Sequence, residues 1–128
     1  MRTRRLFTLL SVTIFLLCST SPGNEIRFTD EDNGETEALA VGDVLVITLD
    51  GNPTTGYQWQ VADYDDAVLE QKGEPTYTRH GAAIGGGGSY DFRFEAAGKG
   101  ETDLRLIYFR PFENKPPIKT FTMTISVE

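Results

Sequence analysis

The stretch Thr120-Phe121-Thr122-Met123-Thr124-Ile125-Ser126-Val127 sets the fold class of this 128-residue chain. Apolar and hydroxyl side chains alternate along it without a break, and a period of two residues is typical of a β-strand with one buried face. Working outward from it, runs rich in Val, Ile, Thr, Tyr and Phe predict further strands at Leu104–Phe109, Tyr90–Glu95, Thr76–Arg79, Ala67–Gln71, Tyr57–Ala62, Asp43–Leu49 and Ile26–Thr29.

Turn-forming residues separate these runs, such as Gly-Asn-Pro at 51–53 and Lys-Gly-Glu-Pro at 72–75. Seven or eight short strands with turn signals at this spacing predict an all-β chain folded as a β-sandwich. No window favours an independent helix, since Asp63–Gln71 is polar and short. We find no internal repeat and no linker, so the sequence predicts one domain.

The N-terminus has the pattern of an export signal. Arg2, Arg4 and Arg5 precede the apolar run Leu6–Leu17, and no acidic residue occurs before Glu25. That run is about a dozen residues long, short of the ~20 that span a bilayer. We therefore expect an exported protein, secreted or periplasmic, without a transmembrane span.

Cleavage of this signal is expected before Asn24, because Ser21 and Gly23 are then the small residues at positions −3 and −1. The expected division is a signal peptide at residues 1–23 and one domain at residues 24–128. A cut before Pro22 would instead place proline beside the scissile bond.

Cys18, the only cysteine, leaves a second possibility open. Its setting after Leu16 and Leu17 resembles a lipoprotein signal, although Leu17 is larger than the small residue that usually precedes a lipidated cysteine. The alternative to simple cleavage is thus a lipid anchor at the cell surface. Either way the domain has no disulfide, and its stability must come from packing.

Charge excludes one class of partner. The chain has 12 Lys and Arg against 19 Asp and Glu, a formal net charge of −7. Loss of residues 1–23 removes three arginines and no acid, which leaves nine basic and 19 acidic residues, a net charge of −10. Binding to the phosphate backbone of nucleic acids relies on Lys and Arg, so we expect no nucleic-acid partner.

Three loops differ from ordinary turns, and the first is Asn52-Pro53-Thr54-Thr55-Gly56-Tyr57. Proline fixes its own φ, the threonines are restricted at χ1, and Gly56 can adopt a positive φ where the chain turns back. A hairpin-like connection rich in turn residues would have the same composition. This loop is therefore stiff, with or without a binding role.

The second loop is the glycine run in Ile84–Ser89. It lacks the preceding strand, the following helix and the Lys-Ser/Thr pair of a phosphate-binding loop. Either it is a flexible hairpin tip, or its backbone lies flush against another molecule where side chains would interfere.

The third loop, Tyr108–Glu113, ends a strand with Arg-Pro-Phe and continues into the polar stretch Asn114–Pro117. This ending is expected to expose a cation, a rigid kink and an aromatic ring together. Arg and aromatic side chains are common anchors of protein interfaces, although the same tripeptide also occurs where strands simply end.

These three loops, in this order, resemble the chagasin family of cysteine-protease inhibitors, which carry Asn-Pro-Thr-Thr-Gly-aromatic, Gly-x-Gly-Gly and Arg-Pro-Trp/Phe loops. The resemblance extends from about Ile26 to Val127. Phe112 stands where many members have Trp, which changes the contact area but not the location of the site. The matching segments are Ala40–Asp43, Asn52–Tyr57, Trp59, Gly85–Gly88, Ala96–Gly100 and Arg110–Phe112.

The resemblance implies an immunoglobulin-like β-sandwich of seven to eight antiparallel strands whose three loops occupy the cleft of a papain-like protease, cathepsin-L-like or similar. It implies a monomeric, reversible, non-covalent inhibitor, with Thr54 and Thr55 nearest the catalytic cysteine and the other two loops gripping the cleft walls. The implied protease-binding residues are Asn52, Pro53, Thr54, Thr55, Gly56, Tyr57, Gly85, Gly86, Gly87, Gly88, Arg110, Pro111 and Phe112.

Other functions receive less support from the residues. His80, the only histidine, has no recognisable nucleophile at triad spacing, so we expect no enzyme. Acidic clusters such as Asp30–Asp32 are typical of solvated turns, and we expect no metal and no cofactor. The remaining alternative is an immunoglobulin-like adhesion or envelope module that binds a partner without inhibiting it.

Overall fold

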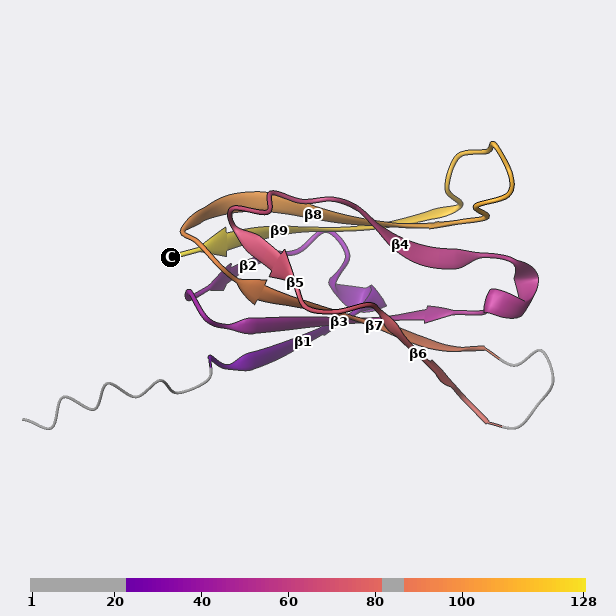
Figure 1. Ribbon diagram of the computed structural model, residues 1–128, viewed down its shortest axis with the longest axis horizontal. Helices are drawn as coiled ribbons and strands as arrows, with labels where there is room; N and C mark the ends of the chain where they lie inside the picture. The colour runs from indigo at the N-terminus through magenta and orange to yellow at the C-terminus, as the bar shows by residue number, and fades with distance from the viewer. Residues whose placement is uncertain (1–22, 82–86) are drawn as a thin grey trace, which may run out of the picture.

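The computed structural model describes residues 23–81 and 87–128, which form two facing β-sheets (Figure 1). Their strands are β1 (Glu25–Thr29), β2 (Thr36–Leu39), β3 (Val44–Gly51), β4 (Gln58–Asp63), β5 (Leu69–Gln71), β6 (Thr76–Arg79), β7 (Gly88–Ala96), β8 (Gly100–Phe109) and β9 (Lys119–Val127). Two short 3-10 turns are η1 (Asp30–Asp32) and η2 (Pro53–Thr55). In this part of the chain we find no helix of the length and hydropathy that a membrane span requires.

Strand order follows the sandwich pattern. One sheet has the order β1-β3-β7-β5, with β6 also paired to β7, and the other has the order β2-β9-β8-β4. The pairs β3 with β7, β8 with β9 and β4 with β8 are antiparallel. The expected immunoglobulin-like β-sandwich is confirmed.

The expectation of seven to eight antiparallel strands is wrong in two details. The described residues contain nine strands, because β2 is added to the eight predicted runs. In addition, β1 is parallel to β3, and β2 is parallel to β9. The connection from β1 to β3 passes through β2 in the other sheet, and a crossover of this kind joins parallel strands where a tight hairpin cannot.

The core lies between the sheets and follows the period of two residues. In β9 the residues Phe121, Met123, Ile125 and Val127 are buried, whereas the intervening hydroxyl residues are partly exposed. Full burial of such a side chain stabilises the fold by roughly 1.5–3 kcal/mol, so this alternation fixes which face of the strand packs inward. The largest fully buried side chains are Phe92, Phe94, Phe121, Leu45, Ile47, Leu49, Leu69, Leu104, Leu106, Met123, Ile125 and Val46.

The two ends of the sandwich carry different connections. The end that we call the loop end holds η2 between β3 and β4, and the long connection between β8 and β9 (Figure 1). The opposite end holds the turn at residues 40–43, the turn at residues 97–99 and the C-terminus (Figure 1).

Candidate functional site

The three loops singled out from the sequence converge at the loop end, as far as the structure describes them. Gly51, the last residue of β3, pairs with Gly88, the first residue of β7, so the end of the glycine run lies beside the first loop. The connection after β8 reaches the same loop from the other sheet. Gly85 and Gly86 lie outside the described residues.

The first loop is a closed 3-10 turn. The Asn52 side chain accepts a hydrogen bond from the Thr54 backbone N–H at 3.1 Å and a second from the Thr54 hydroxyl at 2.5 Å. The Thr55 hydroxyl donates to the Asn52 carbonyl at 2.7 Å, and the Gly56 N–H donates to the Pro53 carbonyl at 3.0 Å. These local bonds hold Pro53, Thr54 and Thr55 at the exposed tip.

Gly56 is required by both conformation and space. Its φ is +85°, in the left-handed region that a residue with a Cβ rarely adopts. A Cβ there would also lie 2.9 Å from two ring carbons of Phe112. The glycine thus lets the third loop pack directly on the first.

Arg110 fastens these two loops together. Its Nε donates to the Thr55 carbonyl at 3.1 Å, and its guanidinium carbon lies 4.3 Å from the centre of the Tyr57 ring. Its Nη1 also pairs with the Glu113 carboxylate at 2.9 Å. The expectation that Arg110 is an exposed cation is therefore wrong, since only about a third of its side chain is exposed (33%).

Aromatic residues support the base of the first loop. The Tyr108 hydroxyl accepts from the Asn52 N–H at 3.0 Å, and the Trp59 indole N–H donates to the Asp50 carbonyl at 2.9 Å. The centre of the Tyr108 ring lies 5.4 Å from the centre of the Tyr57 ring and 5.1 Å from the centre of the Trp59 ring. Such pairs add roughly 0.5–1.5 kcal/mol beyond burial, so both strands that flank the turn are anchored.

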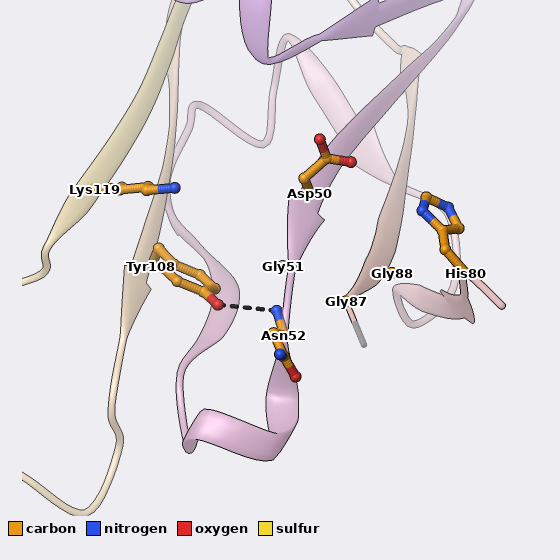
Figure 2. Close-up of a pocket in the computed structure, with 8 residues that line it drawn as sticks. All are labelled: Asp50, Gly51, Asn52, His80, Gly87, Gly88, Tyr108 and Lys119. Atoms are coloured by element: carbon orange, nitrogen blue, oxygen red, sulfur yellow. Dashed lines mark hydrogen bonds between the residues drawn. The ribbon is translucent and has the colours of Figure 1, made fainter. Parts of the chain in front are cut away.

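A hollow of about 430 Å³ opens beside the first loop (Figure 2). Residues from both sheets line it, and the sequence did not single out its charged members as a group. The His80 ring, next to Gly87 and Gly88, is 2.9 Å from the Ser89 hydroxyl. The lining residues are Asp50, Gly51, Asn52, His80, Gly87, Gly88, Tyr108 and Lys119.

The aromatic layer continues beneath the glycines of this hollow. A Cβ on Gly51 would lie 2.7 Å from the Tyr90 ring, which in turn packs 5.0 Å from the Tyr77 ring. Burial raises the pKa of the Tyr90 hydroxyl, and the neighbouring Tyr108 and Tyr77 add to this effect. The group is neutral at physiological pH, so the loop rests on an uncharged aromatic surface.

The exposed surface of the loop end suits contact with a protein. Phe112 is 74% exposed, Ile118 is 56% exposed, and the threonines of η2 stand at the tip. The backbone N–H groups of Thr54, Thr55 and Gly56 are already hydrogen-bonded within that turn. The acidic residue nearest the Arg-Pro-Phe segment, Glu113, is paired with Arg110. This end can therefore enter a concave partner without losing much conformational entropy.

The acidic clusters are part of turns, as expected. Thr29 and Asp32 form a reciprocal cap around η1, and Asp65 caps the turn before β5 through its contact with the Ala67 N–H at 2.9 Å. Across residues 23–81 and 87–128 there is no group of three or more His, Cys, Asp or Glu residues that could hold a metal.

Comparison with known proteins assigns the family. The model of the chagasin family of peptidase inhibitors, I42, matches residues 38–125. Amoebiasin-1 of Entamoeba histolytica is 34% identical over 104 residues, which cover 80% of this chain and all of that protein. The chain therefore belongs to the chagasin family of peptidase inhibitors.

Solved structures show the same fold. The cysteine protease inhibitor EhICP2 of Entamoeba histolytica has a TM-score of 0.75 at 22% identity, with 82% of this chain and 96% of that chain covered. PbICP-C, solved in complex with falcipain-2, has a TM-score of 0.59 at 18% identity over 83% of this chain and the whole of that chain.

Proposed function

We propose that this protein is a reversible, non-covalent inhibitor of papain-like cysteine proteases that blocks the active-site cleft with the loop end of its sandwich. Family membership supports the inhibitory activity, and EhICP2 and PbICP-C support the class of target. The inhibitory function is favoured over an adhesion module that binds without inhibiting.

The observation that carries the mechanism is the closed turn at Pro53–Thr55. A protease cleaves a peptide bond only when the reacting atoms are aligned at about 3–3.5 Å, and proteases hold their substrates extended for this purpose. Here Thr54 and Thr55 are exposed on a 3-10 turn that Asn52 and Gly56 close on both sides. Such a turn can cover the catalytic thiolate while its own peptide bonds stay out of line for attack.

Rigidity makes this contact favourable. The turn is bonded internally, and Arg110 ties it to the third loop through the Thr55 carbonyl. Little freedom is left to lose on binding, and avoiding that loss is how preorganised loops gain affinity.

The flanking loops have different roles in this proposal. Phe112 is exposed and provides apolar contact with one wall of the cleft. Gly87 and Gly88 lack side chains, so the backbone of the second loop can lie close against the other wall. Arg110 acts mainly by positioning the first loop rather than by gripping the protease itself.

We also propose the finer features that the sequence predicted. The inhibitor is a monomer, acts on a cathepsin-L-like or similar enzyme, and is exported after removal of residues 1–23. Cys18 lies outside the described residues, so lipid anchoring rests on sequence alone.

Titration of residues 24–128 against papain and a cathepsin-L-like enzyme tests the function. We expect stoichiometric, reversible loss of protease activity, and the inhibitor to be recovered uncleaved. Absence of inhibition at micromolar concentrations, with folding confirmed by circular dichroism, would overturn the proposal. If the protein is instead an adhesion module, loop substitutions will leave binding to its partner unchanged.

A further inference from the structure

A nearly buried carboxylate lies at the opposite end of the sandwich, remote from the loops. Asp43 is 9% exposed. Its Oδ2 accepts a hydrogen bond from the Ala40 N–H at 2.9 Å, which closes the turn before β3. Its Oδ1 accepts from the backbone nitrogen of Asn24 at 3.1 Å.

This carboxylate lacks a basic side chain as partner. Among the residues that the structure describes, no Lys, Arg or His forms an ion pair with Asp43. A buried charge with hydrogen bonds but no counter-charge is costly, because two N–H dipoles only partly replace the lost hydration. The site would therefore be stabilised by a cation at the position of one of its donors.

The position of Asn24 is fixed from both sides. Its nitrogen faces Asp43, and its carbonyl accepts from the Val44 N–H at 2.9 Å. The next residue, Glu25, begins β1 and pairs with Val44. The preceding Gly23 lies so close to Gly42 that a Cβ would overlap the Gly42 carbonyl.

We propose that proteolytic removal of the leader at the Gly23–Asn24 bond creates the missing cation. An export peptidase hydrolyses this bond with one water molecule, which leaves a carboxylate on Gly23 and a free α-amino group on Asn24. That amino group is protonated below its pKa of about 8. It lies where the Asn24 amide now donates to Asp43, and forms an ion pair with that carboxylate.

Removal of the leader therefore also changes the stability of the fold. In the precursor Asp43 accepts hydrogen bonds from two neutral amides, whereas in the mature chain one donor carries a full positive charge. Both bonds in the precursor already have an ionised acceptor, and the charged amino group adds direct attraction between opposite charges, which is stronger at a nearly buried site than in bulk water. The mature N-terminus therefore locks β1 onto β3 more firmly than the unprocessed chain does. This inference rests on the proposed export and is independent of the inhibitory activity.

The cleavage position is tested with the full chain. It is produced with its own leader in an exporting bacterium, and the intact mass of the purified protein is measured. We expect the mass of residues 24–128 without modification. A mature chain that begins at another residue, retains its leader or carries lipid on Cys18 overturns the proposal.

The ion pair is tested by a double-mutant cycle on purified proteins. Chains that begin at Asn24 or at Ser21, both released from a fusion by a protease that leaves no extra residue, are compared with and without Asp43→Asn. Both chains keep a nitrogen donor at Asn24, but only in the chain that begins at Asn24 does the charged α-amino group lie beside residue 43. Asp66→Asn, in an exposed turn, is the matched control for loss of a carboxylate.

We expect the three additional residues to lower Tm by about 4 °C or more when Asp43 is present, and by less than half of that in the Asp43→Asn background. The Asp66→Asn chain is expected to respond to the extension like the unmodified one. An equal effect of the extension with and without Asp43, or no effect at all, overturns the ion pair even if the cleavage site is correct.

Discussion

Side-chain hydrogen bonds close turns at both ends of the sandwich, but at the loop end the residues at the tip stay exposed to a partner, whereas at the opposite end the side chains that accept these bonds are buried. Thr54, in the turn η2, and Phe112, which packs on that turn, are exposed, and the Asn52 side chain already holds the turn closed through a hydrogen bond. By contrast, Asp43 and Thr102 are buried and accept hydrogen bonds from backbone N–H groups.

This difference in burial implies that one end of the sandwich mainly determines stability and the other mainly determines binding. Buried groups at the opposite end have only partners within the chain, so their loss must destabilise the fold. Exposed groups at the loop end contribute little to folding, and their replacement should affect inhibition instead. Substitutions at the two ends should therefore change different quantities.

The largest effect is expected at the opposite end, from Leu69→Ala. Leu69 is fully buried and pairs with Ala96, the last residue of β7. Removal of its side chain leaves a cavity that costs about 2–5 kcal/mol of unfolding free energy. We expect urea unfolding to show this loss, while the inhibition constant at a temperature where the protein is folded stays within twofold. A parallel loss of inhibition would mean that the two ends are coupled.

A structural feature could be predicted from the sequence where neighbouring residues cause it, and could not where residues distant in the chain cause it. The strand Lys119–Val127 could be predicted because its alternation is a property of the segment itself. The strand Thr36–Leu39 was missed because only Leu39 in it is buried, and its partner is the C-terminal strand. A short polar edge strand owes its conformation to that distant neighbour, which no local pattern reveals.

The candidate site shows the same limit. The stiffness of Asn52–Tyr57 follows from residue types and could be predicted, as could the need for glycine at position 56. The direction of Arg110 could not, since the Thr55 carbonyl and the Tyr57 ring that hold it come from another strand connection. The hollow beside the first loop likewise combines His80 and Lys119, which meet only once both sheets are assembled.

The next largest effect is expected at the loop end, from the pair Thr54→Glu and Thr55→Glu. Two bulky carboxylates at the exposed tip of η2 would have to enter the cleft of the protease. We expect inhibition to weaken at least tenfold, ~1.4 kcal/mol, measured as the inhibition constant against papain.

The stability of this double variant provides the decisive comparison. The threonine hydroxyls bond only within their own exposed turn, so Tm should change little. A control that adds the same two charges to β2, Thr36→Glu with Ala38→Glu, should inhibit normally. If Tm falls as much as inhibition does, the loop has a structural role instead.

A smaller effect is expected from Arg110→Ala, which removes the tie between the two loops. The hydrogen bond to the Thr55 carbonyl and the stacking on Tyr57 are both lost, so the first loop becomes more mobile before binding. We expect inhibition about fivefold weaker, ~1 kcal/mol, mainly through faster dissociation of the complex. Arg105→Ala, exposed on β8, the strand that ends one residue before Arg110, is the matched control and should have no effect. Retention of full affinity by Arg110→Ala would show that the turn at Asn52–Gly56 is rigid without it.

The smallest effect is expected from Phe112→Trp, which leaves the loops bonded and changes only the exposed ring. Phe112 packs on Gly56 with part of one edge and is otherwise open to a partner. The larger indole extends the apolar contact and adds an N–H donor, so we expect inhibition about threefold tighter, ~0.65 kcal/mol, at unchanged Tm. Weaker inhibition would mean that the indole collides with the cleft wall. A shift in Tm would mean that residue 112 supports the loop. In that case the loop end contributes to stability as well as to binding.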